Sequence, residues 1–273
     1  MIWNSTFYDN SHDFVAKYGE GTLSYLKARN TENILDLGCG TGDLTQKITL
    51  SGSTVVGVDS SIEMLERART KFPNIEFIQM NATELEFKNE FDAIFSNAVL
   101  YWVSEKEKAI EGMYAALKKN GRIVLEFGGK GNNEQMLGEL RKSFTKRGFN
   151  DNAKINYWYY PSIGEYSSAL EKKNFRVVHA EHFDRFTPLK GKEGIKDWFL
   201  MFFSDKFFKG IPEIEKEAIL DEVQENLTET HFVNGVWHAD YKRIRIVAIK
   251  DEKINDTFNS IDLCKRRERR NIS

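Results

Sequence analysis

The stretch "NILDLGCGTGDLT", residues 33–45, decides the fold. It begins with a short apolar run and continues with three closely spaced glycines, Gly38, Gly40 and Gly42. An apolar run that is stopped by glycine is typical of a buried strand. Glycines after a strand let the backbone approach a ligand closely, and the next helix directs its N–H groups toward that ligand. The stretch therefore predicts a strand, a ligand-binding turn and a helix.

Strand and helix patterns alternate along the rest of the first half. Further strands are predicted at 54–59, 75–80, 91–97 and 122–128, and helices at 43–50, 60–72 and 105–119. This alternation indicates βαβ units and a parallel sheet with helices on both faces. Two more strands are expected at 175–183 and 241–250. The predicted fold class is α/β, a Rossmann-like, doubly wound and mostly parallel seven-stranded sheet.

A helical cap is predicted before the last strand, because residues 184–240 are too long for a turn and contain two helical patterns rich in aromatics. Asn234-Gly235 is expected to form the hairpin turn that leads back to the sheet, and a helix at 133–147 to continue the alternation of the core. The expected organisation is an N-terminal helical segment at 1–30, a core at 31–183 and 241–250, the cap at 184–240 and a polar basic tail at 251–273.

Composition excludes several classes of protein. The 273 residues carry a formal net charge of −2, which gives no bulk argument for binding nucleic acid or an acidic membrane surface. No apolar run approaches the roughly 18 residues of a membrane span, and the N-terminus does not resemble a signal peptide. The two cysteines, Cys39 and Cys264, do not suggest a disulfide framework, so a cytoplasmic protein is expected. The tail ends in "KRRERR", which favours a solvated segment over a nucleic-acid or membrane contact.

The glycine spacing discriminates among ligands. No Lys-Ser or Lys-Thr follows Gly42, which excludes a P-loop. In a dinucleotide fingerprint the third glycine would stand at Asp43, whose charge would repel a pyrophosphate. Asp36 in the first strand favours a cationic ligand without phosphate. Asp59 ends the second strand, where an acid can accept from both hydroxyls of a ribose. The alternatives are a helix N-cap or turn role for Asp36 and a helix N-cap role for Asp59.

Four successive segments resemble class I S-adenosylmethionine-dependent methyltransferases. They are "ILDLGCGTGDLT", "VVGVDSS", "QMNATEL" and "FDAIFSNAVLYWV", in order across residues 33–103. The N-terminal segment, which resembles a lid helix, and the segments "YYPSIGEYSSALEKKNF" and "RFTPLKGKEGIKDWFLMF" are similar to the trans-aconitate methyltransferase-like branch, which acts on small molecules. The resemblance implies S-adenosylmethionine as cofactor, no metal, and a small-molecule acceptor methylated on a carboxylate or hydroxyl oxygen. A monomer or dimer is expected.

The resemblance also implies roles for individual positions. The turn would wrap the methionine part, Asp59 would hold the ribose, and Asn81 would face the adenine amino group through its carbonyl oxygen. The full set of implied cofactor-binding residues is Tyr18, Asp36, Gly38, Cys39, Gly40, Gly42, Asp59, Ser60, Met64, Asn81, Ala82, Ser96, Asn97 and Trp102. The predicted substrate pocket is formed by Tyr101, Tyr159, Tyr160, Arg185 and Trp198. Arg185 could clamp a carboxylate.

Catalysis by alignment is expected, because the sulfonium already activates the methyl group. His12 is a possible base, and Tyr8 and Trp102 complete the catalytic candidates. Two alternatives stay open, namely methylation of RNA or protein and a non-catalytic module that binds the cofactor. An NAD-dependent oxidoreductase is less favoured, because Tyr114 and Lys118 have dehydrogenase spacing but the glycine turn does not.

Overall fold

A twisted sheet runs through the centre of the molecule, of which the computed structural model describes residues 13–251. Its strands lie in the order β3 (Glu76–Gln79), β2 (Thr54–Asp59), β1 (Asn33–Leu37), β4 (Phe91–Asn97), β5 (Leu117–Gly128), β8 (Val236–Lys250) and β6 (Phe175–Pro188). Strands β1 to β5 pair in parallel. Strand β8 runs antiparallel to both of its neighbours, β5 and β6. The prediction of a mostly parallel, doubly wound sheet is confirmed.

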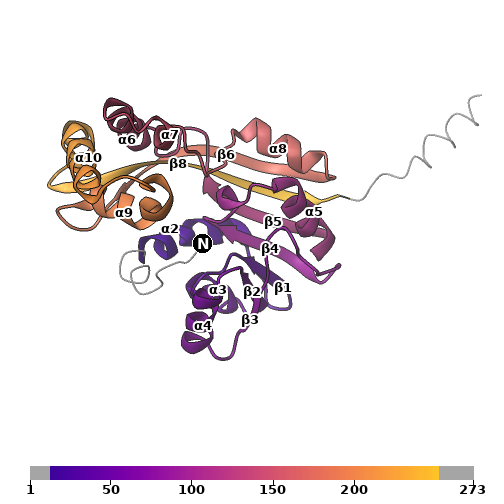
Figure 1. The fold of residues 1–273 in the computed structure, drawn as a ribbon. Coiled ribbons are helices and arrows are strands. Elements are labelled where there is room, and N and C mark those ends of the chain that lie inside the picture. The colour runs from indigo at the N-terminus through magenta and orange to yellow at the C-terminus, as the bar shows by residue number, and fades with distance from the viewer. Residues whose placement is uncertain (1–12, 252–273) are drawn as a thin grey trace, which may run out of the picture.

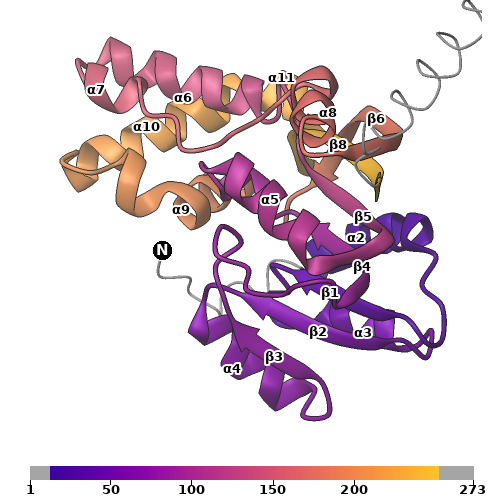
Figure 2. The same cartoon turned by 90° about the vertical axis from the view of Figure 1, so that its right-hand side faces the viewer.

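Helices cover both faces of the sheet (Figures 1 and 2). One face carries α2 (Asp13–Leu26), α3 (Asp43–Thr49) and α4 (Ile62–Lys71), and the other carries α5 (Lys106–Ala116) and α8 (Ile163–Glu171). Local sequence fixes where two of them start. Ser61 caps α4 by accepting from Met64 N, and Ser162 and Glu165 form a reciprocal capping box at α8.

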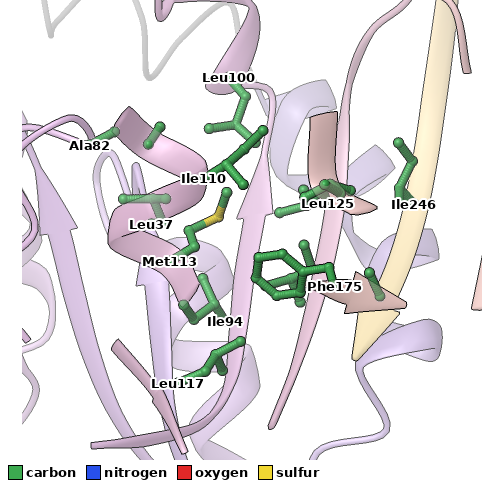
Figure 3. Packing of buried hydrophobic residues seen from close by; sticks show 14 of the residues in the cluster. Leu37, Ala82, Ile94, Leu100, Ile110, Met113, Leu117, Leu125, Phe175 and Ile246 are labelled. Carbon is green, nitrogen blue, oxygen red and sulfur yellow. The ribbon is translucent and has the colours of Figure 1, made fainter. Parts of the chain in front are cut away.

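The main core lies between the sheet and α5 with α8. Figure 3 shows Ile110 and Met113 of α5 among the side chains of Ile94 and Leu125 from β4 and β5. All four side chains are fully buried. Burial of such side chains provides about 1.5–3 kcal/mol each relative to exposure, which holds the strand ends in place beneath the site.

The cap is larger than predicted. It contains α9 (Gly194–Phe207), α10 (Glu213–Asn226) and α11 (Thr228–His231), together with α6 (Glu134–Lys146) and α7 (Asn150–Ala153) (Figures 1 and 2). The prediction that α6 extends the core is wrong. Met136, Leu140 and Phe144 share one buried cluster with Phe199 of α9 and Ile219 of α10. The cap is therefore built from two separate segments of the chain.

Several predicted boundaries also shift. Strand β6 continues to Pro188 and β8 begins at Val236, because residues 183–188 pair with residues 238–243. The helix predicted to 119 ends at Ala116, where β5 begins. The hairpin prediction is confirmed, since Asn234 and Gly235 have φ of 52° and 79° between β7 (Phe232–Val233) and β8.

Two parts of the sequence lie outside the described residues. They are residues 1–12, which include the candidates Tyr8 and His12, and the basic tail from residue 252 onward. Within residues 13–251, no helix has the length and hydropathy needed to cross a membrane.

Candidate active site

A pocket of about 400 Å³ opens at the carboxyl edge of the parallel strands. Ligands bind at this edge in open α/β sheets. Asp59 at the end of β2 lines it, and so does Tyr241 of β8, so the pocket crosses the ends of the intervening strands. Of the predicted site residues it is lined by Gly38, Gly40, Asp59, Ser60, Met64, Asn81, Ala82, Asn97, Tyr101 and Trp102.

The glycine turn is held tightly against β2. The backbone N–H groups of Gly38 and Cys39 both donate to Val58 O, at 2.7 and 3.0 Å. Gly38 has φ of +76°, and a Cβ there would lie 2.1 Å from Cγ2 of Val99. Glycine is required at this position for both its backbone conformation and its lack of a side chain.

Asp59 is positioned by two backbone donors. Its Oδ2 accepts from Gly40 N at 3.0 Å and its Oδ1 from Ser61 N at 2.9 Å. Burial raises the pKa of Asp59, and these hydrogen bonds oppose the rise. A carboxylate offers about four acceptor positions, so roughly two remain for a ligand. Because Ser61 caps α4, the alternative N-cap role for Asp59 is not the observed one.

Four predicted cofactor contacts do not lie on the pocket wall. Asp36 is 2% exposed, and its Oδ2 accepts from Thr45 Oγ1 at 2.6 Å, so it ties β1 to α3. Cys39 packs in a buried apolar cluster, and Gly42, with φ of +84°, precedes α3. Ser96 Oγ donates to Leu37 O at 2.8 Å, which joins β4 to β1. Asp36 thus joins two elements of the core, which is neither a ligand contact nor the N-cap or turn role that was the alternative.

Asp43 is turned away from the pocket wall. Its carboxylate accepts from Thr41 Oγ1 at 2.8 Å and pairs with Lys71 at 2.6 Å. Asp43 was expected to repel a pyrophosphate. Because its carboxylate does not line the pocket, it would not contact such a ligand directly.

Asn97 and Ala98 close the pocket where β4 ends. Asn97 is 8% exposed, and its Oδ1 has no hydrogen-bond partner within the described residues. Ala98 has φ of +61°, a conformation that is costly for a residue with a side chain, and its N–H donates to Glu126 O. The strained residue directs the chain around the pocket.

Apolar side chains line the part of the pocket above β2 and β3. Val58, Met64, Met80 and Ala82 contribute to its wall. Asn81 also lines it, but its Oδ1 already accepts from both N and Oγ1 of Thr83, each at 3.0 Å. Both acceptor positions of this oxygen are used in the structure, so the contact with an adenine amino group stays a prediction that requires the Thr83 bonds to be exchanged.

Aromatic side chains form the opposite end. Tyr101 and Trp102 come from the 3-10 helix η1 (Leu100–Trp102), and the sequence did not single out Phe202 of α9 or Tyr241 of β8 as lining residues. The rings of Tyr101 and Trp102 have centroids 5.1 Å apart. Elements far apart in sequence build this end, which is why local patterns could not identify Phe202 and Tyr241.

The other predicted substrate residues do not line the pocket. Tyr160 packs on Tyr101 with centroids 5.7 Å apart, and Trp198 Nε1 donates to the Tyr241 hydroxyl at 2.7 Å. The Tyr159 ring lies under Lys106, with Nζ 4.4 Å from its centroid. Arg185 donates to Glu126 at 2.5 Å instead of facing the pocket. The backbone of Tyr18 belongs to α2, and its side chain lies outside the described part.

Comparisons with known proteins give the same result as the fold. Residues 34–121 match the family model described as "Methyltransferase domain". An uncharacterized methyltransferase of Schizosaccharomyces pombe is 29% identical over 91% of this chain and 98% of its own length. Trans-aconitate 2-methyltransferase of Klebsiella pneumoniae is 24% identical over the same shares. A Haemonchus contortus phosphoethanolamine N-methyltransferase, solved with S-adenosylmethionine, superposes with a TM-score of 0.53 at 17% identity, over 85% of this chain and 53% of that one.

The chain is similar to class I methyltransferases in its family-model match, in its relatives and in its fold. It is an enzyme that takes its methyl group from S-adenosylmethionine.

Proposed function

We propose that this methyltransferase transfers the methyl group to an oxygen of a small, partly apolar acceptor, either a carboxylate or a hydroxyl. The observation that carries the proposal is the shape of one continuous pocket, with Asp59 at one end and an aromatic chamber of Tyr101, Trp102, Phe202 and Tyr241 at the other. Such a chamber suits a small apolar molecule. The trans-aconitate relative is named for an acidic acceptor, and this name supports an oxygen acceptor here.

The cofactor fits this pocket in one orientation. The two free acceptor positions of Asp59 would take the ribose hydroxyls. The apolar wall around Met64 and Ala82 would contact the adenine. The methionine part would then run along Gly38 and Gly40, and Asn97 Oδ1, which has no partner among the described residues, would accept from its ammonium group. The methyl group would point toward Tyr101 and Trp102.

The chemistry needs alignment more than proton transfer. Displacement of the methyl group from sulfur is an in-line reaction, and holding the reactants in line removes much of the barrier. Burial raises the pKa values of both Tyr101 and Tyr241, so both phenols stay neutral and can donate hydrogen bonds. A carboxylate acceptor is ionised at neutral pH and needs no base. A hydroxyl acceptor would need one, and His12 stays the predicted candidate outside the described residues.

Calorimetric titration with S-adenosylhomocysteine tests the placement of the cofactor. We expect Asp59→Asn to bind at least about tenfold more weakly than the wild type, because a hydrogen bond to a charged group contributes about 1.5–3 kcal/mol. Asp43→Asn is the matched control, since that carboxylate pairs with Lys71 at the surface. Equal affinity of Asp59→Asn and the wild type, with both proteins folded, would contradict the proposal.

A further inference from the structure

A buried charged cluster lies beside the aromatic chamber. Its centre is Glu126 of β5, which is 0% exposed. Glu126 accepts from Arg185 at 2.5 Å, from Arg245 at 2.6 and 2.9 Å, and from the Thr22 hydroxyl at 2.6 Å. Burial opposes ionisation, yet the surrounding guanidinium groups lower the pKa of Glu126, so it is a carboxylate.

Arg243 is a third guanidinium in the same cluster. It is 6% exposed, and its Nε lies 3.7 Å from Glu126 Oε1, which is too long for a hydrogen bond. Three of the four hydrogen bonds that Glu126 accepts go to Oε2, and Oε1 accepts the one from Arg185. The Nε of Arg243 is buried and makes no hydrogen bond within residues 13–251.

The cluster carries more positive than negative charge. Arg185, Arg243 and Arg245 face Glu126 and Glu181, and Glu181 pairs with Arg245 at 2.5 Å. An unbalanced buried charge is costly unless a counter-charge reaches it. The cluster therefore suits an anion that is supplied from outside the described residues.

The aromatic chamber lies next to Arg243. Its guanidinium carbon lies 6.0 Å from the ring centroid of Tyr101, which lines the chamber. Tyr241, another lining residue, stands two positions before Arg243 on β8, so both side chains leave the same face of the sheet. Arg243 thus lies next to residues that line the aromatic chamber, and it is several strands away from Asp59.

We propose that Arg243 is the specificity-determining residue that binds a carboxylate of the acceptor. This inference rests on the proposed function. The planar guanidinium can hold a carboxylate with two parallel hydrogen bonds. The carboxylate reaches Arg243 when the Tyr101 ring turns aside. Acidic acceptors are then preferred over neutral molecules of the same shape, because only they balance the charge of the cluster.

Binding of acceptor analogues to the protein saturated with S-adenosylhomocysteine tests this assignment. The probes are trans-aconitate, octanoate and octanamide, titrated by calorimetry. We expect at least one of the two acids to bind the wild type, and Arg243→Gln to weaken that binding by about 10- to 100-fold. Binding of octanamide and of S-adenosylhomocysteine should change less than about twofold. Arg243→Lys keeps the charge without the planar fork and should give an intermediate loss.

Arg245→Gln is the matched control, because it removes a guanidinium from the same face of the same strand and also from Glu126. Equal losses of acid binding in Arg243→Gln and Arg245→Gln would overturn the assignment, and so would failure of both acids to bind the wild type. If Arg243→Gln instead weakens S-adenosylhomocysteine by the same factor as the acid, the carboxylate is that of the cofactor and the acceptor assignment is wrong. If Arg243→Gln does not fold, the loss of acid binding in Arg243→Lys is compared with the loss in Arg245→Gln and with its own loss of S-adenosylhomocysteine binding. Failure of the wild type to bind S-adenosylhomocysteine would count against the proposed function instead.

Discussion

Substitution by alanine should have different consequences at two glycines of one turn. Both Gly38 and Gly40 line the pocket and have left-handed backbone, with φ of +76° and +55°. At Gly38 a Cβ would meet Cγ2, Cγ1 and Cβ of Val99 at 2.1, 2.6 and 2.8 Å. At Gly40 a Cβ would have no atom of the described residues within 4 Å, apart from its chain neighbours. The first substitution therefore disturbs the fold, whereas the second fills space that a ligand uses.

The magnitudes follow from these geometries. Left-handed backbone costs a residue with a side chain about 1–2 kcal/mol, and this applies to both variants. Displacing Val99 adds about 1–3 kcal/mol for Gly38→Ala. We expect Gly38→Ala to lose about 2–5 kcal/mol of unfolding free energy and Gly40→Ala about 1–2 kcal/mol. Gly40→Ala should nonetheless bind S-adenosylhomocysteine at least about tenfold more weakly than the wild type, because the added methyl group occupies the approach of the cofactor.

Urea unfolding and calorimetric titration of the two variants check both halves of this prediction. The reasoning is refuted if Gly40→Ala binds the cofactor product as tightly as the wild type. It is also refuted if the two variants lose the same unfolding free energy.

Three further substitutions probe the fold. Burial raises the pKa of Asp36 to about 7, so between about pH 4 and 7 the folded protein holds a proton that the unfolded chain has lost, and stability falls as pH rises. Between pH 5 and 8 the wild type should lose about 2–3 kcal/mol more unfolding free energy than Asp36→Asn does. Equal losses in the two proteins, measured by urea unfolding at both pH values, would contradict this. Phe199→Ala should cost about 3–5 kcal/mol by leaving a cavity in the cap, and a loss below about 1 kcal/mol would contradict the fully buried position. Ser61→Ala should cost about 1 kcal/mol through loss of the cap on Met64 N, and unchanged thermal unfolding would contradict it.

Local patterns are sufficient to predict the strands of the first half and their ligand-binding edge. The apolar run 33–37 is stopped by Gly38, and Asp59 follows the β-branched run of β2, so strand ends and polar residues are adjacent in sequence. The positions of these residues at one edge then follow from parallel pairing. This is why Asp59 could be predicted on the pocket wall from local patterns, whereas Met64 and Ala82 were implied by the family resemblance.

Features that depend on contacts between distant segments could not be predicted in this way. The apolar face of α6 is the same whether it packs on the sheet or on α10, and only the folded chain selects the cap. Glu126 and Arg245 are 119 positions apart, so nothing local connects them. Asp36 was expected at the ligand because it precedes the turn, but its side chain leaves β1 toward Thr45 of α3.

The central claim is that S-adenosylmethionine occupies the pocket between Asp59 and the aromatic chamber. A crystal structure with S-adenosylhomocysteine bound tests it most directly. We predict ribose hydroxyls within hydrogen-bonding distance of both Asp59 oxygens, and the sulfur directed toward Tyr101 and Trp102. A nucleoside bound elsewhere, or a ribose that does not contact Asp59, would contradict the account.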